Sequence, residues 1–209
     1  LGERITDSVA LWGTEDGYAA DADSGLNTRG AADVVVEDID GDGYLDILFA
    51  NGGDDDAGRA SSTLYWGSRL GFSPSDTSFF PGHHASSVTV ADVNRDGLLD
   101  VVLANFREGV DLSDPDDYDT QSTIFLGDDQ RFATDATMEL DTYAARDCTV
   151  GDFDRDGFAD VAFAQGSIHT LVSVVYPGNA DGPNADLAFE LPTKQARGVL
   201  AVDLDEDGY

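Results

Sequence analysis

Four segments of the chain alternate apolar and polar residues, and each lies directly ahead of an aspartate-rich run. A period of two indicates β-strands with one buried face. The alternating apolar pairs are Val34 and Val36, Val88 and Val90, Cys148 and Val150, and Val199 and Ala201. An unbroken apolar run follows the first three aspartate-rich runs, at 47–50, 101–104 and 161–164. Such runs suit a second strand buried on both faces, and no stretch shows convincing helical periodicity.

Two further strands are predicted in each repeat. A third strand ends at a glycine, in segments 8–12, 63–66, 123–126 and 172–176. A fourth is expected to begin near an aromatic residue five positions past that glycine: Tyr18, Phe72 and Phe132. The last repeat has Pro183 at that position and Phe189 further on.

The repeats have a period typical of propellers or solenoids. The first aspartates of the four runs are Asp38, Asp92, Asp152 and Asp203, which are 54, 60 and 51 residues apart. Each lies 25 residues after a glycine, namely Gly13, Gly67, Gly127 and Gly178. The length variation therefore lies between each aspartate and the next glycine, where we expect a surface loop.

Four short antiparallel strands per repeat describe a β-propeller blade. We predict an all-β excerpt of a larger ring: a half blade at 1–29, blades at 30–83, 84–143 and 144–195, and the start of another at 196–209. All belong to one propeller domain. The loops between first and second strands should lie on one face. The variable loops between second and third strands should lie on the opposite face, with the connections from one blade to the next.

The aspartate-rich loops carry carboxylates at positions 1, 3, 5 and 9 and a glycine at position 6. Short carboxylates on a sharply turning loop supply the oxygen ligands that Ca²⁺ takes, and position 7 can add a backbone carbonyl. An EF-hand would need Glu at position 12 and flanking helices. Position 12 is Phe49, Leu103 or Phe163, each inside a predicted strand.

The run from Asp38 to Asn51, followed by Leu64-Tyr-Trp-Gly67, resembles the FG-GAP/VCBS repeats of integrin-α-like β-propellers. The resemblance covers almost the whole chain and implies six to eight blades in the closed ring. It also implies Ca²⁺ as cofactor, held by loop positions 1, 3, 5 and 9 and by the carbonyl of position 7. The implied side-chain ligands are Asp38, Asp40, Asp42, Asp46; Asp92, Asn94, Asp96, Asp100; Asp152, Asp154, Asp156, Asp160; and Asp203, Asp205, Asp207. The implied carbonyls belong to Tyr44, Leu98, Phe158 and Tyr209.

The loops differ in ways that carry further predictions. Asn94 replaces a carboxylate, so the second loop should bind Ca²⁺ most weakly. The position 4 side chains are expected to be solvated, and those of position 2 to press each loop onto its blade. Position 4 is Arg95, Arg155 or Glu206, and position 2 is Ile39, Val93, Phe153 or Leu204.

The net charge of −31 argues against a nucleic-acid partner, because phosphates would be repelled. Calcium would neutralise only part of this charge, and the Asp-rich, Lys-poor balance resembles halophilic proteins. Asp54–Asp56 and the aspartates of 111–119 are expected to be solvated loops, with a partner-binding rim as the alternative. The single cysteine, Cys148, excludes an internal disulfide and is expected to be a core residue.

Other residues that often carry chemistry have simpler interpretations here. His83, His84 and His169 lack zinc or triad spacing and are expected to be loop residues. Trp12 and Trp66 are expected to pack within blades rather than bind sugars.

These observations predict a non-enzymatic, calcium-stabilised scaffold that is extracellular or at the cell surface and serves adhesion or protein recognition. Its protein or glycan ligand is expected on the face opposite the calcium loops. A lectin-like propeller, a polysaccharide lyase of propeller fold, or an accessory module of a secreted enzyme are the alternatives. No apolar stretch approaches the roughly 18 residues of a membrane span.

Overall fold

The computed structural model describes residues 7–11, 13–15, 17–18, 24–53, 61–107, 114–129, 131–132, 138–166 and 172–203. Three four-stranded antiparallel sheets dominate these residues, as the all-β prediction requires. Two short 3₁₀ turns, η1 (Pro115–Tyr118) and η2 (Ala185–Leu187), are the helical elements within the described ranges.

Each sheet contains four strands in chain order. The first sheet comprises β5 (Ala31–Glu37), β6 (Asp46–Asn51), β7 (Ser62–Tyr65) and β8 (Thr77–Phe80). The second comprises β9 (Ala85–Ala91), β10 (Asp100–Asn105), β11 (Asp119–Phe125) and β14 (Met138–Tyr143). The third comprises β15 (Ala145–Gly151), β16 (Asp160–Gln165), β17 (Val172–Tyr176) and β18 (Phe189–Pro192). This meander order is that of propeller blades.

The N-terminal part is smaller. Strand β1 (Ser8–Ala10) pairs with β4 (Ser24–Leu26), and β2 (Gly13–Thr14) forms a hairpin with β3 (Gly17–Tyr18). Leu26 packs against Phe49 and Tyr65 of the first sheet. These elements correspond to the outer strands of a preceding blade.

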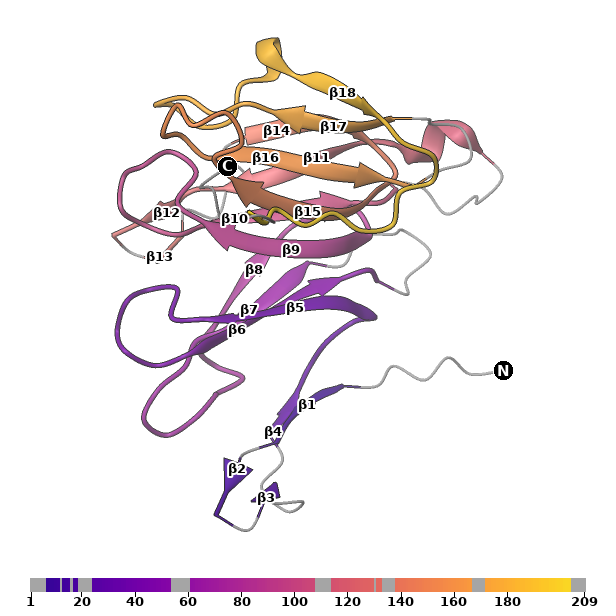
Figure 1. The fold of residues 1–209 in the computed structure, drawn as a ribbon. Coiled ribbons are helices and arrows are strands. Elements are labelled where there is room, and N and C mark those ends of the chain that lie inside the picture. The colour runs from indigo at the N-terminus through magenta and orange to yellow at the C-terminus, as the bar shows by residue number, and fades with distance from the viewer. Residues whose placement is uncertain are drawn as a thin grey trace.

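The sheets pack face to face (Figure 1). One apolar cluster, including Leu48, Leu64 and Leu103, lies between the first and second sheets. A second, including Val102 and Phe163, lies between the second and third. The aspartate-rich loops emerge on one side of the stack, which we call the metal-loop face. The β10–β11 connection with η1 emerges on the other side, the variable-loop face.

Hydrogen bonds also join the first strand of the first sheet to that of the second, and the first strand of the third sheet to the segment after β18. Asp33 Oδ2 accepts the Val88 N–H at 3.1 Å, and Asp147 Oδ2 accepts the Val199 N–H at 2.9 Å. The Ser87 hydroxyl lies 2.8 Å from a carboxylate oxygen of Asp33 and 2.8 Å from one of Asp147. These contacts fix the register of successive inner strands.

The predicted core residues are buried where a neighbouring sheet covers them. Cys148 is a buried free thiol, as predicted, and Val88 is buried as well. Val34, at the equivalent position, is 48% exposed. It lies on the side of β5 away from the second sheet, where the described residues include no inner strands of a preceding blade.

The fourth strands begin later than predicted at Phe72 and Phe132. Strand β8 begins at Thr77 and β14 at Met138, whereas the last repeat starts β18 at Phe189. Phe132 instead lies in a hairpin of β12 (Gly127–Asp128) and β13 (Arg131–Phe132). Its ring centroid is 6.2 Å from that of Trp66 and 5.0 Å from that of Phe80. The repeated aromatic fills the space between blades and does not start a strand.

Candidate metal centres

The three complete aspartate-rich loops share one backbone geometry. The glycine at position 6 has a φ of 90° in Gly43, 91° in Gly97 and 89° in Gly157, a conformation that favours glycine. Each of these glycines donates its N–H to the position 1 aspartate at 2.9–3.0 Å. Each position 7 N–H reaches the position 5 carboxylate at 2.8 Å. The loop is therefore closed by its own aspartates, and positions 1, 3 and 5 are drawn together.

The carboxylates of positions 1, 3 and 5 converge in the first and third loops. Oxygens of Asp38, Asp40 and Asp42 lie within 4.8 Å of one another, as do those of Asp152, Asp154 and Asp156. Asp38 Oδ1 is buried and has no hydrogen-bond partner. Three convergent carboxylates and an orphaned buried oxygen fit a hard divalent cation that takes oxygen ligands.

The second loop differs at Asn94. Its Nδ2 donates to Asp96 Oδ2 at 3.0 Å, so the amide occupies an oxygen that would otherwise face a cation. Asp92 retains its position, with one oxygen accepting the Gly97 N–H and the other the Asp96 N–H. The loop thus satisfies more of its own acceptors than the first or third.

The position 9 aspartates have a second role that the sequence analysis missed. Each is almost fully buried, at 1% exposure for Asp46, 0% for Asp100 and 2% for Asp160. One oxygen accepts the N–H of loop position 2, at 2.7–2.8 Å. The other accepts the N–H of the glycine after the third strand, at 2.7–2.8 Å. This arrangement, the position 9 bridge, ties the loop to the end of the third strand.

The glycine of the bridge allows an unusually close approach. A Cβ on Gly67 would lie 2.1 Å from the Leu45 carbonyl oxygen, and one on Gly127 would lie 2.5 Å from that of Leu99. A Cβ on Gly178 would lie 2.3 Å from the Ala159 carbonyl oxygen. The constant spacing of these glycines was the signal in the sequence that could have revealed the bridge.

Burial changes the acidity of the bridging carboxyls. Desolvation raises the pKa of Asp100 to about 6, although the two N–H donors act to lower it. Desolvation also raises the pKa of Asp46. A cation beside these groups would favour their ionised form.

Arginines from neighbouring blades contact two of the loops. Arg131 Nε lies 3.2 Å from Asp40 Oδ2, and its guanidinium carbon lies 4.1 Å from the Trp66 ring centroid. The Arg95 guanidinium lies over Phe158 of the third loop, with 5.2 Å to the ring centroid. Arg95 is exposed, as expected for position 4, and its stacking on Phe158 is an additional contact. Trp66 is buried, as predicted, and it packs in the cluster between the first and second sheets.

The position 2 residues differ in burial, depending on whether a neighbouring sheet covers them. Ile39 and Val93 are buried in the clusters between sheets, as predicted. Phe153 is 41% exposed. It lines an open groove with Leu200 and Val202, whose segment forms no strand, and so the pressing role predicted for it is wrong.

Several predicted residues cannot be placed. Asp203 is described, with a buried Oδ1, but the rest of the fourth loop lies outside the described residues. The residues outside are Leu204, Asp205, Glu206, Asp207, Tyr209, Trp12, Asp54–Asp56, Asp111 and His169. Tyr44, Leu98 and Phe158 follow the loop glycines directly, as position 7 requires.

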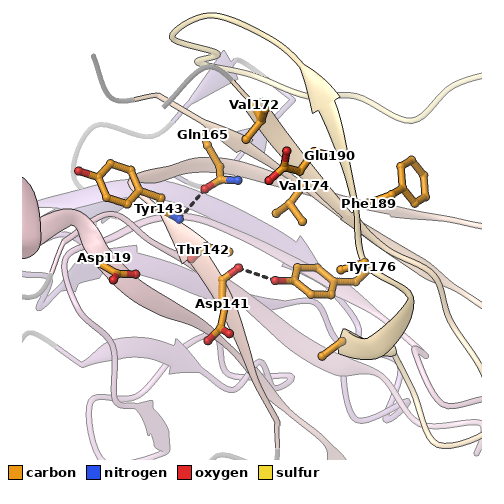
Figure 2. A pocket seen from close by; sticks show the side chains of 12 residues that line it. Asp119, Asp141, Thr142, Tyr143, Gln165, Val172, Val174, Tyr176, Phe189 and Glu190 are labelled. Carbon is orange, nitrogen blue, oxygen red and sulfur yellow. Dashed lines mark hydrogen bonds between the residues drawn. The ribbon is translucent and has the colours of Figure 1, made fainter. Parts of the chain in front are cut away.

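A groove of about 510 Å³ opens between the second and third sheets (Figure 2). Asp119, Asp141 and Glu190 contribute carboxylates to it, and Tyr143 and Tyr176 contribute phenol rings. The Tyr143 N–H donates to Gln165, and the Tyr176 hydroxyl donates to the Asp141 carbonyl. Asp119, Tyr143 and Gln165 lie at strand ends on the variable-loop face.

Comparison with known proteins supports the repeat assignment. Residues 38–103 match the family model of the FG-GAP-like repeat. The matched segment runs from the first aspartate-rich loop through most of β10, so it contains two such loops. Residues 38–103 therefore carry FG-GAP-like repeat sequence, and the antiparallel four-stranded sheets are consistent with propeller-like blades. The search of curated proteins returned no match. Within the described residues, no helix is long and apolar enough to cross a membrane.

Proposed function

We propose that this chain is part of a calcium-stabilised β-propeller scaffold for extracellular adhesion or protein recognition, without catalytic activity of its own. The observation that carries the proposal is the convergence of three carboxylates in the first and third loops. Asp38, Asp40 and Asp42 would hold one ion, and Asp152, Asp154 and Asp156 another. Bound calcium would neutralise carboxylates that otherwise repel one another.

The recognition surface is proposed on the variable-loop face. Loops on one face of a rigid scaffold are where binding residues are commonly found. The groove between the second and third sheets reaches this face at Asp119, Tyr143 and Gln165, and it combines phenol rings with carboxylates. A carbohydrate ligand is the second candidate, because aromatic rings flanked by hydrogen-bonding groups suit sugars. Binding of the wild type to a glycan array, compared with binding of the D141N and Y143A variants to the same array, would separate a carbohydrate ligand from a protein ligand.

Thermal unfolding with Ca²⁺ and with chelator, both in molar KCl, tests the metal proposal. High salt in both arms screens the general acidic repulsion. An ion at 100 times its Kd adds ~2.7 kcal/mol per independent site, so several sites should raise Tm by many degrees. D42N and D156N should each lose part of the shift. D181N removes an exposed carboxylate outside the loops and should keep it. Equal Tm values in Ca²⁺ and chelator would refute the proposal.

A further inference from the structure

An arginine on the variable-loop face forms no ion pair with an acidic residue in the described part of the chain. Arg146 lies on the first strand of the third sheet, and its guanidinium carbon is 3.7 Å from the ring centroid of Phe106, which follows β10. Its Nε is buried and has no hydrogen-bond partner. A buried guanidinium N–H without an acceptor costs free energy, so an unfilled donor here calls for a function.

The side chain is fixed in position by packing. A Cβ on Gly166 would lie 2.4 Å from Arg146 Cγ and 2.5 Å from the Ala196 carbonyl oxygen. The absence of a side chain at Gly166 therefore leaves room for the aliphatic part of Arg146. With Phe106 on one side and Gly166 on the other, the guanidinium is preorganised, which lowers the entropy cost of binding a ligand.

The charge around Arg146 is positive. Burial is the main cause that lowers the pKa of Arg146, and the positive charge of Arg197 lowers it further. Arg197 is exposed on the segment after β18, and the described residues give it no ion pair. In a chain with 42 acidic and 11 basic residues, two neighbouring arginines that form no ion pair among the described residues are unexpected.

A third guanidinium lies close by along the chain. Arg107 directly follows Phe106, and its Nη2 is 3.1 Å from Nε2 of the buried His84. Its Nη1 is buried and also lacks a hydrogen-bond partner. His84 lies in the bend before β9, as expected of a loop residue, and its burial and its contact with Arg107 are additional findings. Two half-buried arginines, Arg107 and Arg146, thus each keep one buried nitrogen without a hydrogen-bond partner.

We infer that Arg146 and Arg197 form an oxyanion-binding site on the variable-loop face, which takes a carboxylate or sulfate group displayed by the ligand. A planar guanidinium offers paired N–H donors to such a group, and the bound charge would relieve the repulsion between the two arginines. This inference deepens the proposed function, since it names the chemistry of the recognised ligand. An acidic chain would repel anions elsewhere, so the site would also give orientation to binding.

The test measures Tm as a function of sulfate concentration against chloride of equal ionic strength, with Ca²⁺ present throughout. Acetate serves as the carboxylate probe. Sulfate stabilises many proteins by exclusion from their surface, so variants are needed to isolate binding. R146M keeps an apolar contact with Phe106 and removes the charge, R197Q removes the exposed charge, and R69Q is a matched exposed arginine on the metal-loop face.

We expect R146M to raise the apparent Kd for sulfate by about tenfold or more, a factor that corresponds to ~1.4 kcal/mol. R197Q should weaken sulfate binding less, and R69Q should leave it unchanged. In chloride, R146M should be at least as stable as the wild type, because a desolvated charge is removed. If R146M does not fold, the inference is tested by comparing the apparent Kd for sulfate of R197Q with that of R69Q.

The inference would be overturned if the wild type, R146M, R197Q and R69Q all showed the same change of Tm with sulfate and the same change with acetate. It would also be overturned if the Tm of the wild type did not respond to either anion. The calcium shift is measured on the same samples. If that shift persists while the anion response is absent, the oxyanion site fails and the calcium scaffold stands.

Discussion

Replacing Asp100 with Asn tests the position 9 bridge. The side chain is completely buried, and its two oxygens accept the Val93 and Gly127 N–H groups at 2.8 Å each. Asn keeps one acceptor oxygen and turns an NH₂ group toward the other N–H. One hydrogen bond to a charged group is lost and one buried donor is left unsatisfied. The free energy of unfolding should therefore fall by ~2–4 kcal/mol.

The measurement is urea unfolding of D100N and of D96N, each with Ca²⁺ and with chelator, at pH 8. The Asp100 carboxyl, whose pKa is about 6, is then ionised. Asp96 is the matched control, because it is exposed in the same loop and its bond to the Leu98 N–H is accessible to water. In chelator D96N should lose less than ~1 kcal/mol, whereas D100N should show its full loss. A D100N protein as stable as the wild type in chelator would refute the bridge and leave Asp100 as a metal ligand alone.

Three further predictions concern other sites. N94D should tighten calcium binding to the second loop by roughly tenfold, because it adds a carboxylate and frees Asp96 from its bond to the amide. A calorimetric titration that finds no change in calcium affinity would contradict this prediction. Cys148, whose pKa burial raises to about 12, should react with a thiol reagent only after unfolding, and rapid labelling of the native protein would count against the predicted packing. Burial and the charge of Asp141 raise the pKa of Tyr176 to about 12. Its stabilising contribution should thus be complete below pH 10 and decline as the pH rises toward 12. Y176F should reduce that decline in alkaline unfolding curves, and an unchanged curve would argue against the shift.

The repeated strands and the turns of the loops could be predicted from the sequence because both are local. Alternation at Val88 and Val90 and the glycine at position 6 each depend on a few neighbouring residues. The fourth strand was misplaced because Phe132 packs against Trp66 of the preceding blade, a contact without a local signature. The ion pair of Arg131 with Asp40 was missed for the same reason.

The candidate metal loops themselves were identified as motifs, but the second role of position 9 was not. An aspartate in a metal-binding motif is already explained as a metal ligand, so nothing in the motif indicates that the residue has a further structural role. The bridge becomes visible only when the third strand brings Gly67 beside Asp46. The cluster around Arg146 depends likewise on two sheets meeting, and the sequence shows only scattered basic residues.

The hydrogen bonds of the inner strands connect each sheet only to the sheet or segment beside it. Asp33 reaches Val88, and Asp147 reaches Val199, so each contact joins nearest neighbours. The energetics of such an array approach a sum of unit terms and interface terms, as in a one-dimensional chain of coupled elements. A substitution that weakens one interface should therefore divide unfolding into separate steps at that seam. The cooperativity of the whole array is set by its weakest junction.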